Sequence, residues 1–182
     1  MFYMISLSFF KFIKNYAFQI FVIFFFTINL IFYPQLTQSE IKNSINGSGL
    51  KIPRVVSLKN LLTFMRTGPG KEFPIKYEIN LKGYPVEIIA EFNNWRKVNT
   101  KNNLSGWIHT QLLSSLRTGL ITTNTPLKRR PSVSSKTLAK LLPDLLIKVK
   151  KCRLEWCNIE VFKSKKFVGW VKKKAIWGSV NK

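Results

Sequence analysis

Few side chains in this sequence have the types and spacing that catalysis or metal binding requires. The only histidine is His109, the only aspartate is Asp144, and the glutamates are scattered along the chain. Cys152 and Cys157 form a single C-x4-C pair without a second pair, which is a poor zinc site. Because no nucleophile stands beside a base and no carboxylate pair or metal-ligand cluster occurs, the sequence predicts a non-enzymatic protein without metal or cofactor.

The chemistry that the sequence does support is binding through aromatic and basic side chains. A tryptophan in a small domain can bury its ring in the core, or it can line a groove for an extended ligand, and the sequence leaves both readings open. Arg66 can likewise contact a ligand or brace the carbonyl groups of its own loop. The candidate ligand-binding residues are Arg66, Phe73, Tyr77, Trp95, Trp107, Trp156 and Trp170.

The net charge is strongly positive, at +22 for 182 residues, and lysine supplies most of it. Such a surface attracts polyanions such as nucleic acid, anionic lipid head groups or acidic envelope polymers. The abundance of lysine, asparagine, isoleucine and phenylalanine together is also typical of AT-rich genomes, which is an alternative source of the charge. The run Lys172-Lys173-Lys174 is accordingly either a solvated face or a docking surface for anionic head groups or acidic glycan.

The segments that contain the candidate binding residues form an internal repeat in the sequence. Pro69 is matched by Pro131, Trp95 by Trp156, and Gly106-Trp107 by Gly169-Trp170, each about 60 residues further along the chain. A repeat of that length is one small domain in two copies. Turn signals recur every few residues, so each copy is expected to be a small antiparallel barrel or sandwich of five or six short strands.

Two segments of the second copy carry specific structural predictions. Leucines in Ser134–Leu142 have helical spacing, but the match to the first copy assigns this segment to a strand and loop. Ile147–Lys151 alternates apolar and basic residues, which is typical of an edge strand. Trp156–Val161 pairs back against it, so Cys152 and Cys157 flank a hairpin turn and predict a cross-strand disulfide.

The N-terminus predicts export. Lys11 and Lys14 precede an uncharged apolar run, Tyr16–Tyr33, which is a secretory signal that is either cleaved near Thr37-Gln38-Ser39 or kept as a membrane anchor. Both outcomes place the repeats outside the cytoplasmic membrane, which argues against nucleic acid as a partner. The predicted organisation is a signal or anchor at 1–39, a linker at 40–53, and two domains at 54–116 and 117–182.

With these motifs in view, the chain resembles the bacterial SH3-like family. The likeness lies in four segments of the first copy: Arg66–Gly70, Lys82–Ile89, Trp95–Val98 and Gly106–Ile108. It is most similar to short exported proteins of alphaproteobacteria with two such domains in tandem, which also have a C-x4-C hairpin and a Trp-Gly pair, here Trp177-Gly178. The second copy departs from the pattern, with Lys128 in place of arginine and Arg129–Ser132 in place of Gly-Pro-Gly. These departures bear on ligand binding by that copy, not on its fold.

The resemblance implies an all-β fold of two tandem SH3-like barrels and an extracytoplasmic binding role. Domains of this family often bind peptidoglycan or peptide segments, so the expected partner is peptidoglycan or an envelope protein, with an anionic membrane surface as a further possibility. The predicted function is an exported binding protein of the periplasm and cell envelope that holds its ligand in an aromatic and basic groove. The alternative is a scaffold for an envelope enzyme, such as a cell-wall hydrolase, that does not itself bind glycan.

Overall fold

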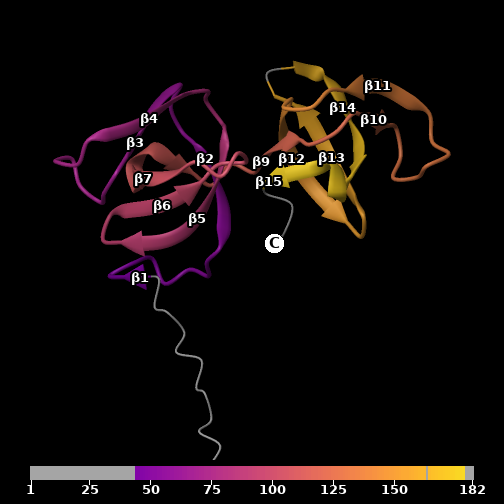
Figure 1. Cartoon of the computed structure of the whole chain (residues 1–182). Helices are drawn as coiled ribbons and strands as arrows, with labels where there is room; N and C mark the ends of the chain where they lie inside the picture. Colours follow the sequence, from indigo (N-terminus) through magenta and orange to yellow (C-terminus); the bar gives the residue numbers. More distant parts are fainter. Residues whose placement is uncertain (1–43, 163, 179–182) are drawn as a thin grey trace, which may run out of the picture. The chain divides into compact units, whose positions relative to one another are not determined.

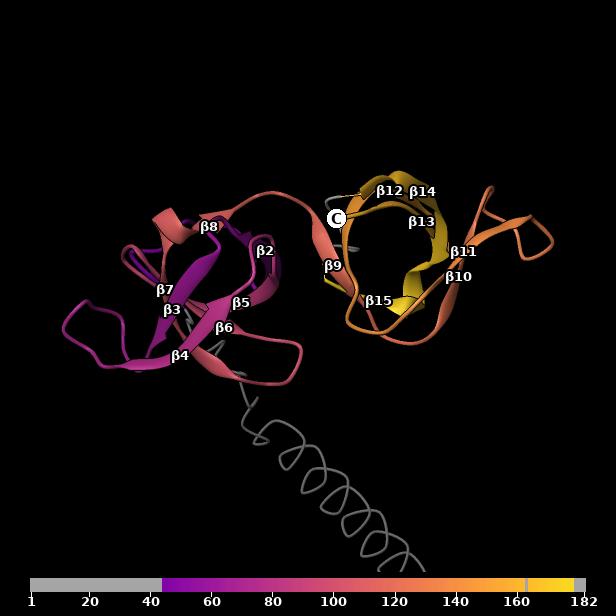
Figure 2. The same ribbon diagram turned by 90° about the horizontal axis from the view of Figure 1, so that it is seen from above.

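The chain folds into two small all-β barrels, one for each copy of the repeat (Figures 1 and 2). The computed structural model describes residues 44–162 and 164–178, so the predicted signal or anchor at 1–39 lies outside the described residues. Within the described ranges, no helix is long and apolar enough to cross a membrane. Residues Lys42–Lys182 form a compact unit of the chain that contains both barrels and both of their cores.

The first barrel is a sheet in the order β4-β3-β7-β6-β5-β2-β8, with β1 paired in parallel to β5. Burial alternates along its strands, as a sheet with one core face and one solvent face requires. The elements are β1 (Ser44–Ile45), β2 (Arg54–Leu58), β3 (Leu62–Arg66), β4 (Ile75–Asn80), β5 (Pro85–Phe92), β6 (Trp95–Asn99), β7 (Ser105–His109), the 3₁₀ turn η1 (Thr110–Leu112) and β8 (Leu113–Ser114).

The second barrel repeats this plan in the order β11-β10-β14-β13-β12-β9-β15. In the view of Figure 2 its strands form a ring. The elements are β9 (Thr118–Ile121), β10 (Thr125–Lys128), β11 (Thr137–Leu141), β12 (Leu146–Arg153), β13 (Trp156–Val161), β14 (Ser164–Lys172), the 3₁₀ turn η2 (Lys173–Ala175) and β15 (Ile176–Gly178).

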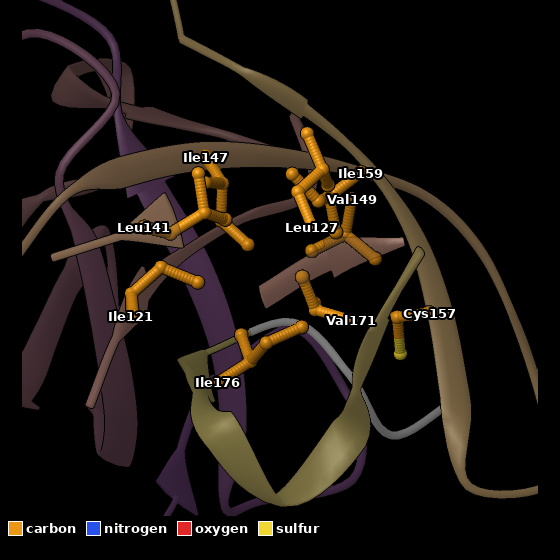
Figure 3. Close-up of a cluster of buried hydrophobic side chains, with 9 residues drawn as sticks. All are labelled: Ile121, Leu127, Leu141, Ile147, Val149, Cys157, Ile159, Val171 and Ile176. Carbon is orange, nitrogen blue, oxygen red and sulfur yellow. The ribbon is translucent and has the colours of Figure 1, made fainter. Parts of the chain in front are cut away.

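Each barrel is built on its own small apolar core. Six fully buried side chains form the first core: Leu58, Met65, Val86, Ile88, Val98 and Ile108. Nine form the second, where they converge from several strands (Figure 3): Ile121, Leu127, Leu141, Ile147, Val149, Cys157, Ile159, Val171 and Ile176. Cores of this size give little stability by packing alone, so each barrel needs further cross-links.

The structure decides both secondary-structure predictions for the second copy. Thr137–Leu141 is the strand β11, which confirms that the repeat outweighs the helical spacing of the leucines. The prediction that Ile147–Lys151 is an edge strand is wrong, because β12 pairs with both β13 and β9. Its alternation of apolar and basic residues instead reflects one face toward the core and one toward solvent.

A buried ion pair cross-links the β5–β6 hairpin of the first barrel. Glu91 and Arg96 are register partners, and Arg96 Nε lies 3.1 Å from Glu91 Oε1. Glu91 also pairs with Arg54 and accepts hydrogen bonds from the backbone N–H (2.6 Å) and hydroxyl (2.8 Å) of Ser48. The carboxyl is only 3% exposed, and burial alone would raise its pKa. The hydrogen bonds from Arg54 and Ser48 outweigh burial and hold the pKa of Glu91 at about 2.

The same network binds the segment that precedes the first barrel. Residues 40–53 were predicted as a linker, yet the described part of this stretch contacts β5. Ser44 and Ile45 pair with Glu91 and Phe92, and the N–H of Asn93 donates to the carbonyl of Ile45 at 3.0 Å. Residues from Ser44 onward are therefore a structural part of the first barrel.

A disulfide occupies the equivalent place in the second barrel. Cys152 and Cys157 are register partners across the β12–β13 hairpin, and they are joined, as the sequence predicted. They stand 61 residues after Glu91 and Arg96 respectively, at the matching positions of the repeat. One hairpin is thus cross-linked by charge and the other by a covalent bond.

Replacement of Glu91 by glutamine is expected to lower the free energy of unfolding of the first barrel by about 2–3 kcal/mol at pH 7, because it leaves two partly buried guanidinium groups without their counter-charge. Since the folded pKa is depressed, the wild-type contribution is present above about pH 4.5 and is lost as the pH falls toward 2. Urea unfolding of wild type and E91Q across this range measures the difference, which should shrink at acid pH. Glu87→Gln on the same strand is the control, and equal effects of both variants would contradict the account.

Removal of the disulfide in the double variant Cys152→Ala/Cys157→Ala is expected to destabilise the second barrel by about 2 kcal/mol, because the bond closes a very short loop. Hydrogen exchange of the β12 and β13 amides reports this barrel separately from the first. Protection in β5 and β6 should not change, and unchanged protection in β12 and β13 would show that the bond contributes nothing.

Candidate functional site

A basic side chain braces the loop that follows β3 in the first barrel and β10 in the second. In the first barrel, Arg66 Nη1 donates to the carbonyl of Phe73 at 2.7 Å, across the loop that contains Gly68-Pro69-Gly70. In the second, Lys128 Nζ donates to the carbonyl of Ser135 at 3.0 Å. Lys128 therefore does in its barrel what Arg66 does in the other, although the sequence departs from the repeat there.

The candidate aromatics of the first barrel lie in different environments. Trp107 and Trp95 lie half-buried on the outer faces of β7 and β6, where Trp107 is the register partner of both Arg66 and Lys97. The ring of Trp95 meets His109 edge-on at 5.2 Å. Arg66 and Trp107 are thus brought together, with Trp95 on the same face.

Phe73 and Tyr77 differ in how much of their rings is available. The ring of Phe73 covers Gly68 and is 37% exposed, so it is accessible at the loop. Tyr77 is half-buried and packs against the apolar core, with the ammonium of Lys76 5.3 Å from its ring centroid. A ligand on the outer face of β6 and β7 would reach Trp107 but not the core-facing side of Tyr77.

The second barrel presents its tryptophans between lysines. Trp156 and Trp170 lie half-buried on the outer faces of β13 and β14. The Nζ atom of Lys172 lies 5.7 Å from the ring centroid of Trp156, and that of Lys151 lies 5.9 Å from the ring centroid of Trp170. Each indole is therefore adjacent to a positive charge.

A groove of about 470 Å³ opens beside Trp156. Its lining includes one indole, three lysine side chains, two threonines and one asparagine. Its lining residues are Thr123, Asn124, Thr125, Pro126, Lys128, Val133, Trp156, Lys172, Lys174 and Ala175. The groove is lined by an indole and by three lysines and has no carboxylate in its lining, so it suits a ligand that has sugar rings or aromatic groups together with anionic substituents.

The described residues include the side-chain types that metal sites use, His109 among them. They contain no cluster of three or more His, Cys, Asp or Glu side chains that could hold a metal ion. His109 ends β7 as a half-exposed strand residue, and its Nδ1 accepts the N–H of Gln111 at 3.3 Å, which caps η1. Its contacts within the barrel are therefore structural.

Sequence reasoning found part of this groove and missed the rest. It identified Trp156 and noted the run that contains Lys172 and Lys174. It missed Val133 and the segment Thr123–Pro126, which leads into β10 and includes its first two residues. A run of small polar residues before a strand reads as an ordinary turn, and only the fold brings it next to Trp156.

The sequence matches one protein family. A family model for the bacterial SH3 domain matches residues 60–115 and 122–178, which is more than half of the sequence. The chain therefore belongs to the bacterial SH3 domain family and contains two copies of the domain in tandem. A bacterial SH3 domain is a binding module and not a catalytic one, in keeping with the site described above.

Searches against individual proteins add little. No curated protein matches the chain. Among solved structures it is similar to NlpC2 from Trichomonas vaginalis, with 15% identity, a TM-score of 0.31 and coverage of 70% of this chain and 49% of that one. It is also similar to an NlpC/P60 family protein from Bacillus cereus, with 14% identity, a TM-score of 0.31 and coverage of 69% of this chain and 57% of that one. The chain spans about half the length of these proteins, and at such scores neither informs its function.

Arg66→Ala is expected to loosen the loop of the first barrel, because it removes the hydrogen bond that holds the carbonyl of Phe73. Amide exchange in residues 67–74 should rise, while the free energy of unfolding falls by only about 1 kcal/mol. Lys97→Ala removes a neighbouring charge on the same face and is the matched control. Unchanged exchange in R66A would mean that the loop is held by its backbone hydrogen bonds alone.

Proposed function

We propose that this protein is an exported, non-enzymatic binding protein of the bacterial cell envelope, and that the groove beside Trp156 holds peptidoglycan. The observation that carries the proposal is the groove itself, in which an indole face and the ammonium groups of Lys128, Lys172 and Lys174 line one hollow. Sugar rings pack against aromatic faces, and the carboxylates of the wall peptides would meet the ammonium groups.

Two separate features support the proposed location outside the cytoplasmic membrane. The apolar run Tyr16–Tyr33 after Lys11 and Lys14 has the composition of an export signal or an anchor. The disulfide between Cys152 and Cys157 joins strands β12 and β13 of the second barrel. Disulfides persist in oxidising compartments such as the periplasm. Together these features support a location outside the cytoplasmic membrane, where peptidoglycan is the dominant polymer.

Co-sedimentation of residues 42–182 with purified sacculi tests the proposal, at low salt and at about 0.5 M salt, where exposed charges are largely screened. Binding is expected to persist at high salt and to weaken by about tenfold in Trp156→Ala, because the ring contact is lost. Trp95→Ala is the matched control, since Trp95 holds the same position in the first barrel and does not line the groove.

Three results would count against the proposal. Binding that disappears at high salt would be adsorption of a polycation, and equal binding by wild type and W156A would place the ligand elsewhere. No binding at either salt would exclude wall targeting.

The second candidate function is a scaffold for an envelope enzyme. It is favoured by the edge strand β4, whose Ile75 is 45% exposed and pairs with Arg66 at the end of β3; the exposed Leu62 lies at the other end of the same strand pair, opposite Asn80. An exposed apolar strand edge can accept a strand from a partner protein. Ile75→Lys would abolish such pairing and leave sacculus binding unchanged, so the two functions are separable in the same assay.

A further inference from the structure

A second hollow, distinct from the groove, lies in the loop between β10 and β11. It has a volume of about 420 Å³ and is lined by Arg129, Arg130, Ser132, Ser134, Ser135 and Lys136. Every lining residue is either basic or a hydroxyl donor, and none is acidic or apolar. The loop projects from the body of the barrel in both views (Figures 1 and 2).

The backbone of this loop is fixed before any ligand arrives. The N–H of Arg130 donates to the hydroxyl of Ser135 at 2.9 Å, and the N–H of Arg129 donates to the carbonyl of Lys136 at 3.0 Å. The ammonium of Lys128 holds the carbonyl of Ser135 from the barrel side. Because the turn is braced at three points, a ligand would not have to order it, which lowers the entropic cost of binding.

The positive charges of the hollow are not neutralised by the protein. Within residues 44–162 and 164–178, no ion pair involves Arg129, Arg130 or Lys136. A lysine-rich composition does not explain the pair of adjacent arginines, because lysine dominates the basic residues elsewhere in the chain. Arginine presents planar donors that match oxyanions two at a time.

The first barrel provides an internal comparison. Its equivalent loop contains Lys71 and Glu72, whose charges cancel, and the carboxylate of Glu72 lies against Gly70. The same brace therefore supports a neutral glycine-rich loop in one barrel and a purely basic, serine-rich loop in the other. The two loops therefore differ in their side chains and share the same brace.

We propose that this hollow, the basic loop of residues 129–136, binds a phosphate group. Two guanidinium groups and one ammonium supply charged donors, and the hollow also holds the hydroxyls of Ser135 and of Ser132 and Ser134, which hydrogen-bond to each other at 2.9 Å. Such a set of donors suits a tetrahedral phosphate anion better than a planar carboxylate. The phosphate can belong to an anionic phospholipid head group, to a phosphorylated glycan or to free phosphate. This site does not depend on the groove or on binding to the wall.

The first test uses inorganic phosphate with residues 42–182 at pH 7, followed by NMR of the backbone amides at constant ionic strength in chloride. Saturable shifts are expected in residues 130–136, with an affinity about tenfold weaker in Arg129→Gln/Arg130→Gln. Lys140→Gln/Lys148→Gln removes the same charge from exposed positions outside the hollow and should retain the affinity within about twofold. An unchanged Trp156 indole resonance shows that each variant is folded.

The second test identifies the source of the phosphate. Vesicles of phosphatidylglycerol and phosphatidylcholine are compared with vesicles of phosphatidylcholine alone. Loss of phosphatidylglycerol-dependent binding in R129Q/R130Q, but not in K140Q/K148Q, assigns the site to lipid head groups; phosphate shifts without this difference assign it to soluble or glycan phosphate. The proposal is overturned if phosphate causes no saturable shift, or if both double variants weaken binding equally.

Discussion

The structure depends on a cross-link at one position of the long hairpin in each barrel. The cores are too small to fix that hairpin by packing. In the first barrel the buried pair Glu91–Arg96 joins β5 to β6, and in the second the disulfide Cys152–Cys157 joins β12 to β13 at the matching register. In both, the residue just before the second cross-linked position is the outward-facing tryptophan, so the cross-link also sets where the indole lies.

The ion pair and the disulfide differ in the number of further residues on which each depends. The ion pair is stable because Arg54 and the segment around Ser48 complete the environment of Glu91, so the first barrel incorporates the chain that precedes it. The disulfide needs no such support. The second barrel carries its positive charge in two places: Arg129, Arg130 and Lys136 in the loop, and Lys128, Lys172 and Lys174 in the groove.

Much of the fold could be predicted from the sequence, because it rests on local signals. The turns at Gly68-Pro69-Gly70 and Asn93-Asn94, the alternating strands and the C-x4-C hairpin each specify their structure over a few residues. The role of Glu91 could not be predicted, since two of its three partners, Ser48 and Arg54, lie 43 and 37 residues from it along the chain. The edge-strand prediction for β12 failed because alternation reports one solvent-facing side, and an inner strand of a barrel also has one. The candidate groove was only half visible, because Thr123–Pro126 meets Trp156 through the fold alone.

The central claim is that the groove beside Trp156 is the ligand site. The most direct measurement is an NMR titration of residues 42–182 with a soluble disaccharide-peptide fragment of peptidoglycan at about 0.5 M salt. The account predicts saturable shifts at the Trp156 indole N–H and at the amides of Thr125 and Lys172, with the matching positions around Trp95 unaffected. Shifts confined to the first barrel, or none at all, would contradict it.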